Sequence, residues 1–549
     1  MITRRATVGA LLAITLLVAC SDGGSTPKSQ AKARPRSTST AARRIGAGPG
    51  PERSVAGAEP AAERIDKHVA GAPAGTMRMH YTFGPIAIEP GQNNITFSKG
   101  QIPQPREDGW ILRIAPNLVR KDGKVPPVDV IHLHHGVWLN LAQKDITFPG
   151  FPERFVAAGE EKTITVMPSG FGYQYHASDR WLINYMLHNL TAKRDQVWIT
   201  YDIDFLPATA AAAKTMRPAR PVWLDVQNGS TYPVFDALKG SGTNGRFTYP
   251  DQAIDPYRGQ PAKNTWTADR PGMLISAGGH LHPGGLWDDI NLTRPGASAP
   301  PGSKAAQAAS GDTVRLFRSE AKYYEPAGAV SWDVSMTVTP LDWRVAVRPG
   351  DVLSISTTYD TRRASWYESM GISMVWMVDG AGGADPFQQR VDRPGHVTHG
   401  HLPENSHHGG KSHDMADMTT RADSPAPGQI DIIDFIWARG DMSSPKGAAI
   451  PSVRQGGTLK FFNKDAPVGP GIWHTITACK APCNLETGVA YPLADATVQF
   501  DSGELGAAGP PTSGTVEWHT PADLPAGTYT YFCRIHPFMR GAFRVLPKA

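Results

Sequence analysis

Short alternations of apolar and polar residues are the dominant pattern along this chain. Residues 163–166 (TITV) and 197–200 (VWIT) show the period of two that is typical of half-buried β-strands. Such segments recur between turns rich in glycine and proline, of which the chain has 56 and 48. Long stretches with helical periodicity are scarce. The pattern therefore predicts an all-β protein made of sandwich or barrel domains.

The first twenty residues have the features of an export signal. Arg4 and Arg5 precede an apolar run at residues 8–19, which is shorter than the roughly 20 residues that a membrane span needs. The run ends in Leu-Val-Ala-Cys, which resembles the bacterial lipobox and implies lipidation of Cys20. We therefore expect residues 1–20 to be a lipoprotein signal peptide and the protein to be anchored to the outer face of the bacterial cell membrane. A plain signal peptide with an incidental cysteine is the alternative.

Composition and charge limit the number of folded domains and the kinds of partner that the chain can have. Residues 21–75 are rich in small and polar residues and have too few large apolar side chains for a core, so we expect a disordered stalk. About 470 residues remain, enough for roughly three folded domains. The net charge is only +5, and much of the excess lies in the stalk. Nucleic acid binding is not indicated, and a basic tether beside anionic lipids is the simpler explanation.

Three of the four cysteines lie near the end of the chain. In an oxidising compartment, Cys479 and Cys483 could pair across the tight Lys-Ala-Pro loop between them. This pairing would leave Cys533 as a single thiol.

The sequence after Cys533 offers a complete set of soft metal ligands. The thiolate of Cys533, the imidazole of His536 and the thioether of Met539 follow one another at intervals of three residues. This ligand set suits copper, with methionine as the weak axial ligand. His474, on a predicted strand, would supply a second imidazole, and His519 is the rival for this role. We therefore predict a type 1 copper site.

The last 120 residues also carry a family resemblance. The segment Cys533–Met539 resembles the copper loop of the amicyanin and plastocyanin group of cupredoxins, which reads Cys-x-x-His-Pro-x-Met. Gly541 and residues 543–546 continue the pattern, which ends in a glycine and a last strand. The resemblance implies a Greek-key β-sandwich at residues 429–549.

Two more histidine clusters lie upstream. His132, His134 and His135 follow each other within an apolar strand, and His280 and His282 form a His-x-His pair. Alternate residues of a strand face the same side, so His280 and His282 can bind one metal ion. Imidazoles without thiolates suit copper or zinc.

In their order along the chain, these clusters resemble the copper type II, ascorbate-dependent monooxygenases, the family of peptidylglycine alpha-hydroxylating and dopamine beta-monooxygenases. The family has two tandem, jelly-roll-like β-sandwich domains, which the resemblance places at residues 76–220 and 221–385. It implies an electron-transfer copper held by His134, His135 and His188. It implies a second, catalytic copper that activates dioxygen, held by His280, His282 and Met370.

Spacing leaves rival ligands open. On a regular strand His132 and His134 face the same side, so His135 would point away unless the strand bulges. The rivals are His132 in the first cluster, His176 for His188, and Met374 or Met377 for Met370.

The chain also departs from the family. No cysteine lies between Cys20 and Cys479, so the family's disulfides are missing. The peptide hydroxylase holds its substrate carboxylate with an arginine and a tyrosine, whose places are taken here by Gly278 and Met374. Peptide amidation is therefore not predicted, and the substrate stays open.

Residues 386–428 form a polar linker with six histidines and two methionines. Histidine-rich tracts can bind metal, and a solvated tether is the plain alternative. The linker would raise the effective concentration of the cupredoxin near the other two copper sites.

Together these features predict an exported copper monooxygenase that hydroxylates a C–H bond of a small-molecule substrate with dioxygen. The fused cupredoxin would supply or relay electrons from a redox partner, in place of or together with the ascorbate that the family uses. The alternative is a surface copper-handling or electron-transfer lipoprotein without substrate oxidation.

Overall fold

Strands account for nearly all the regular structure. The computed structural model describes residues 63–128, 130–229, 233–253, 264–297, 312–324, 332–398, 417–443, 448–466, 472–479, 500–509 and 512–549. Within these ranges the helical segments are two short 3-10 turns, η1 (Ala211–Thr215) and η3 (Met418–Thr420). The all-β prediction is confirmed. The predicted signal peptide, Cys20, the start of the stalk and five histidines of the linker lie outside the described residues.

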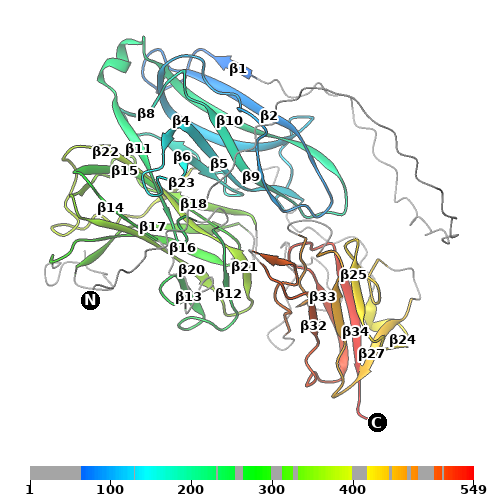
Figure 1. The fold of residues 1–549 in the computed structure, drawn as a ribbon. Helices are drawn as coiled ribbons and strands as arrows, with labels where there is room; N and C mark the ends of the chain where they lie inside the picture. Colours follow the sequence, from blue (N-terminus) through cyan, green and yellow to red (C-terminus); the bar gives the residue numbers. More distant parts are fainter. Residues whose placement is uncertain are drawn as a thin grey trace, which may run out of the picture. The chain divides into compact units, whose positions relative to one another are not determined.

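The first sandwich (blue through cyan to blue-green in Figure 1) has two antiparallel sheets. One contains, in spatial order, β1 (Glu63–Asp66), β2 (Met77–Ile88), β10 (Asp195–Pro207) and β4 (Gly109–Arg120), with β7 (Thr165–Val166) and β8 (Phe171–Tyr175) beside β4. The other contains β3 (Ile95–Phe97), β9 (Trp181–Asn189), β5 (Ile131–Lys144) and β6 (Pro152–Ala158). Large side chains such as Trp138, Trp181 and Phe205 fill the core between them.

The second sandwich (green in Figure 1) also has two main sheets. One contains β11 (Arg217–Asp225), β22 (Gly371–Asp379), β15 (Gly272–Leu281), β18 (Val334–Val338), β19 (Val345–Val347) and β23 (His396–Val397). The other contains β13 (Arg246–Tyr249), β14 (Thr265–Thr267), β20 (Val352–Asp360), β16 (Gly285–Thr293) and β17 (Thr313–Tyr323). A separate pair joins β12 (Phe235–Ala237) to β21 (Trp366–Ser369).

The third sandwich (yellow to red in Figure 1) carries the cupredoxin-like loop. Its larger sheet has the order β24 (Asp423–Pro425), β27 (Ile450–Arg454), β34 (Arg540–Leu546), β33 (Gly527–Phe532), β29 (Thr477–Cys479). Its smaller sheet has the order β26 (Ile436–Trp437), β25 (Ile430–Ile433), β28 (Lys460–Asn463), β32 (Glu517–His519), and a short pair joins β30 (Ala508–Gly509) to β31 (Thr512–Ser513). Parallel pairing of β27 with β34 and of β25 with β28 requires crossover connections between these strands.

The alternation of side chains along β22 explains how the first two sandwiches adhere. Ile372, Met374 and Trp376 pack with the core residues of the first sandwich. Val375 and Met377, which point the opposite way, pack into the core of the second sandwich. Because both faces of this strand are buried, a register slip of one residue would exchange the two sets of contacts. The described residues from 63 onwards accordingly belong to one compact unit.

Candidate copper sites

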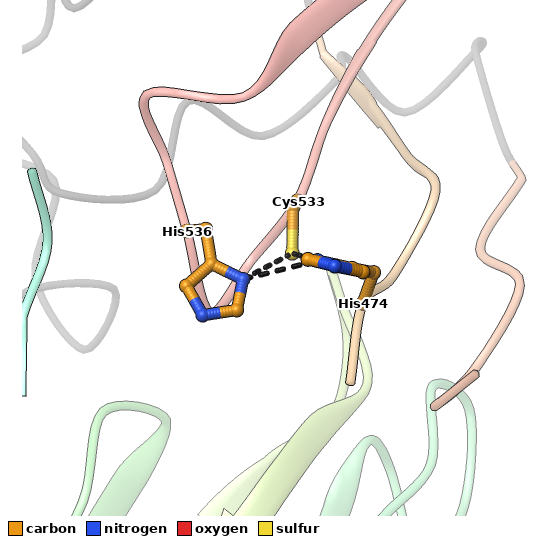
Figure 2. Close-up of side chains that lie close together, drawn as sticks. All are labelled: His474, Cys533 and His536. Atoms are coloured by element: carbon orange, nitrogen blue, oxygen red, sulfur yellow. Dashed lines mark hydrogen bonds between the residues drawn. The ribbon is translucent and has the colours of Figure 1, made fainter. Parts of the chain in front are cut away.

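The third sandwich brings three ligands together at the start of the loop between β33 and β34. Cys533 follows β33 directly, and His474 lies on a neighbouring segment that bridges to Leu505. Cys533 Sγ is 3.7 Å from His474 Nδ1 and 3.6 Å from His536 Nδ1, and the two Nδ1 atoms are 3.1 Å apart. All three side chains are buried, and Figure 2 shows them pointing toward one another.

The two distances from Cys533 Sγ fit a trigonal metal site, and the two Nδ1 atoms, at 3.1 Å, would move apart by a few tenths of an ångström around an ion. Three donors placed evenly around an ion at roughly 2.0–2.3 Å would lie about 3.5–3.8 Å apart. Each imidazole is also fixed through its other nitrogen, because His474 Nε2 is 2.9 Å from Asp465 Oδ2 and His536 Nε2 is 2.8 Å from the Gly91 carbonyl oxygen. Such outer partners leave Nδ1 as the ligand atom. The residues therefore fit copper.

Further contacts support this reading of the loop at residues 533–539, called the copper loop below. The Thr475 amide donates a 3.4 Å hydrogen bond to Cys533 Sγ, an interaction that tunes thiolate copper sites. Met539 is buried, and its backbone is hydrogen-bonded to Cys533 and His536. Burial opposes protonation of His474, but the contacts with Asp465 and Cys533 raise its pKa overall.

The structure also locates the rival ligand His519 and one cysteine of the predicted disulfide. His519 is exposed on β32, away from the Cys533 cluster, so the structure assembles His474 instead. Cys479 is buried and disulfide-bonded, whereas its predicted partner Cys483 lies outside the described residues.

A β-bulge decides which histidines of β5 share a face. Leu133 pairs with Leu187 and His135 with Met186, so His134 is an extra residue in the ladder. Leu133, before the bulge, and Trp138, after it, both pack in the core of the first sandwich. The extra residue shifts the alternation of side chains along the strand by one position. His134 and His135 can therefore both face the second sandwich, and their ring centroids are 5.7 Å apart.

His134, His135 and His188 share one chemical feature. Each is buried, and each Nδ1 atom has no hydrogen-bond partner among the described residues. The Nε2 atom of His135 is 3.2 Å from Asn184 Oδ1, and that of His188 is 2.8 Å from the Ile535 carbonyl oxygen. Buried ring nitrogens without partners suit metal ligation. The ring centroids of His134 and His188 are 6.1 Å apart, however, so this set is more open than the Cys533 site.

The ligand atoms of the His-x-His pair already lie close together. His280 Nε2 lies 3.2 Å from His282 Nε2, close enough for both to bind one ion. The opposite nitrogens are held, because His280 Nδ1 is 2.9 Å from Glu161 Oε2 and His282 Nδ1 is 2.6 Å from the Glu368 carbonyl oxygen. Glu161 belongs to the first sandwich, so the pair is oriented from both sandwiches.

A small cavity of about 70 Å³ adjoins His280. His135, His280 and Met370 line it, together with apolar side chains that include Phe97 and Trp223. Of the rival methionines, Met377 packs into the core of the second sandwich, whereas Met374 lines a second cavity together with His280. Met370 differs from Met374 in sharing its cavity with His135 as well as His280. The structure thus places Met370 near ligands from both predicted copper sites.

The two predicted sites are contiguous. The rings of His134 and His282 have centroids 4.1 Å apart, so one histidine cluster is formed by His132, His134, His135, His188, His280 and His282. His176, the rival for His188, is exposed and lies outside this cluster.

Sequence reasoning missed Trp332. Its ring centroid lies 4.3 Å from His132, 5.4 Å from His134 and 5.8 Å from His282. No local motif marks this tryptophan, since its neighbours come from distant strands.

Sequence reasoning also missed the acidic residues beside the cluster. Glu160, Glu161 and His280 place three potential ligand atoms within 4.8 Å of one another. Burial and the neighbouring Glu161 raise the pKa of Glu160, whereas contact with His280 outweighs burial and lowers the pKa of Glu161. Glu161 is therefore the ionised partner of His280. The adjacent Glu-Glu pair was the only signal in the sequence.

Burial keeps most imidazoles of the histidine cluster in the neutral form. Burial lowers the pKa of His135 to about 3 and that of His188 to about 4. Burial and the neighbouring histidines also lower the pKa values of His134 and His282. These imidazoles are neutral at physiological pH, which is the form that binds metal ions.

The lowered pKa values predict acid sensitivity of the metal-free protein. Below pH 6.5 the unfolded chain takes up protons at His135 and His188, whereas the folded chain does not until about pH 4 or below. Stability is therefore fully present above pH 6.5 and falls as the pH drops toward 4. The midpoint of urea unfolding should decrease over this range, and less so in His135→Gln. His176→Gln, at an exposed site, should behave as wild type, and equal midpoints at pH 7 and pH 5 would contradict the expectation.

Comparisons with known proteins give partial likenesses. No protein-family model and no curated protein matches the chain. A purple cupredoxin from Nitrosopumilus maritimus is 18% identical over 22% of this chain and 99% of its own, with a TM-score of 0.14. A copper-containing nitrite reductase from Thermus scotoductus is 12% identical over 50% of this chain and 55% of its own, with a TM-score of 0.16.

A glycosylasparaginase, PNGase F from Flavobacterium meningosepticum, is 9% identical over 59% of this chain and 99% of its own, with a TM-score of 0.23. These scores are low, and the case for copper rests on the ligand geometry given above. In the described part of the chain, no helix is long and apolar enough to cross a membrane.

Proposed function

We propose that the protein is a copper-dependent monooxygenase that hydroxylates a C–H bond, with electrons supplied through its cupredoxin-like sandwich. The observation that carries this proposal is the His280–His282 pair. Its two Nε2 atoms converge to 3.2 Å, outer partners fix both rings, and His280 lines a mainly apolar cavity. A metal held there would face a space in which a small substrate can lie.

The residues around the proposed catalytic copper would have different roles. His280 and His282 would hold the ion, and the soft thioether of Met370 favours the reduced state, Cu(I). Copper, when bound, supplies one-electron chemistry and the activation of dioxygen. The buried ring of Trp223 and the half-exposed ring of Phe97 would contact an apolar substrate in the cavity. The overall reaction takes up dioxygen, two electrons and two protons, and it yields the hydroxylated product and water.

The remaining histidines of the cluster would hold a second copper. His134, His135 and His188 offer three buried Nδ1 atoms without hydrogen-bond partners in the described residues. The 4.1 Å separation of the His134 and His282 rings gives an electron only a short distance to travel between the two sets. The ligand atoms of these three residues do not all lie within 4.8 Å of one another, so the rings would have to move closer together around an ion.

One observation favours the second candidate, an electron-transfer or copper-handling lipoprotein without substrate oxidation. The Cys533 site has a thiolate and two imidazoles within 3.7 Å of one another, which is the ligand set predicted for an electron-transfer copper. That site alone would suffice for electron transfer.

Copper content and oxygen use distinguish the two candidates. The purified mature protein should bind three copper ions per chain and consume dioxygen in proportion to a hydroxylated product when small apolar substrates and a reductant are supplied. The His134→Ala variant should lose one copper, and His176→Ala should lose none. A single copper per chain that is indifferent to His134→Ala would overturn the monooxygenase proposal and leave the electron-transfer protein.

A further inference from the structure

The copper loop is docked directly on the histidine cluster. His188 Nε2 donates a 2.8 Å hydrogen bond to the carbonyl oxygen of Ile535, which lies two residues after Cys533. His536 Nε2 donates a 2.8 Å hydrogen bond to the carbonyl oxygen of Gly91, in the first sandwich. His188, Ile535 and His536 are all buried, so water does not intervene at these contacts.

Arg534 extends the contact to the second sandwich. Its guanidinium donates a hydrogen bond to the Ser365 carbonyl oxygen and lies 4.6 Å from the ring centroid of Trp366. The neighbouring Tyr367 packs against the core of the third sandwich. Three consecutive residues of the copper loop, 534–536, therefore each contact one of the other two sandwiches.

We propose that the hydrogen bond between Ile535 and His188 is the route by which electrons pass from the Cys533 site to the histidine cluster. The path runs along the backbone from Cys533 to the Ile535 carbonyl, crosses one hydrogen bond, and reaches the His188 ring, whose Nδ1 is free to bind copper. The inference rests on the proposed function for the second copper. One electron moves, no atom is transferred, and an external one-electron donor restores the reduced cupredoxin copper.

Gly91 offers a way to disturb the docking without replacing a copper ligand. A Cβ atom at this position would lie 2.5 Å from Phe435 Cε1 and 2.9 Å from His536 Cδ2, both in the third sandwich. Gly123 is the matched control, because it has a similar positive φ of 78° against 63° for Gly91, and a Cβ atom there meets nothing within 4 Å. Gly91→Ala and Gly123→Ala thus share the backbone strain and differ in the clash.

The experiment reduces the copper of the Cys533 site rapidly with a photochemical one-electron donor and follows the return of its blue absorption. In wild type the return should be independent of protein concentration and accompanied by loss of the Cu(II) magnetic resonance signal of the histidine cluster. Overpacking by one methyl group should lower the docked population, and with it the rate, by about tenfold in Gly91→Ala. Gly123→Ala should match wild type. A rate that is unchanged in Gly91→Ala, or that depends on concentration in wild type, would refute the route.

A second variant and a metal-free measurement guard against local damage at His536. Tyr367→Ala removes a docking contact of the second sandwich, whereas Gly91 belongs to the first, and it should also slow the transfer. Hydrogen exchange of the metal-free protein should show faster exchange in the copper loop of both variants but not of Gly123→Ala. Unchanged protection in both variants would overturn the docking itself.

The route and the proposed function can fail separately. Electron transfer within the chain without any hydroxylated product would overturn the monooxygenase and leave the route intact. Hydroxylation by wild type, together with transfer that Gly91→Ala does not slow, would keep the enzyme and overturn the route.

Discussion

Replacing Cys533 with serine is expected to abolish the intense visible absorption of the copper-loaded protein and to remove one copper ion per chain. The thiolate is the only sulfur anion among the ligands that the structure assembles, and its bond to copper produces the blue colour of such sites. Serine is nearly the same size, so the buried position should tolerate it. The change therefore tests the ligand and not the packing.

The same variant should lose the stabilisation that copper gives to the third sandwich. A ligand that binds only the folded state at a hundred times its Kd stabilises it by about 2.7 kcal/mol. Copper should raise the unfolding temperature of wild type and of His519→Ala, in which an exposed histidine is removed. Visible absorption, copper analysis and thermal unfolding measure the effect. Retention of the blue band in Cys533→Ser, or its loss in His519→Ala, would show that the ligands are misassigned.

The Cys533 site could be predicted from sequence because most of its ligands lie on one short loop. Cys533, His536 and Met539 are held at fixed spacings by the chain itself, so their residue types already specify a site. Only His474 had to be chosen from elsewhere. The sequence favoured His474, on a predicted strand, over His519, and the structure places His474 Nδ1 3.7 Å from Cys533 Sγ while His519 is exposed.

The histidine cluster could be predicted only in part. Whether His135 joins His134 depends on a bulge, and the register of β5 against β9 is not encoded in the spacing of the histidines. Trp332 and Glu161 reach the cluster from strands or turns that are far away in sequence. Long-range packing of this kind leaves no local pattern, so the contiguity of the two predicted copper sites emerged only from the fold.

His282→Ala is expected to lose one copper ion and essentially all formation of hydroxylated product, while the blue absorption of the Cys533 site remains. His282 contributes one of the two Nε2 atoms that converge at 3.2 Å, and alanine leaves His280 without its partner. Because substitution of mere outer partners at metal sites typically costs about 10–100-fold in affinity or activity, removal of a ligand should cost more than about 100-fold. Product analysis and copper content measure the two effects.

Glu161→Gln supplies the graded counterpart of this experiment. Glutamine keeps the shape of the side chain but removes the negative charge that faces His280 Nδ1, so activity should fall by about 10–100-fold and not vanish. His176→Ala, at an exposed position of the first sandwich, should leave both activity and copper content unchanged. Full activity of His282→Ala would exclude this pair as the reacting site. Loss of the blue band in the same variant would instead mean that the substitution disrupts the third sandwich, which the separate ligand sets of the two sites do not predict.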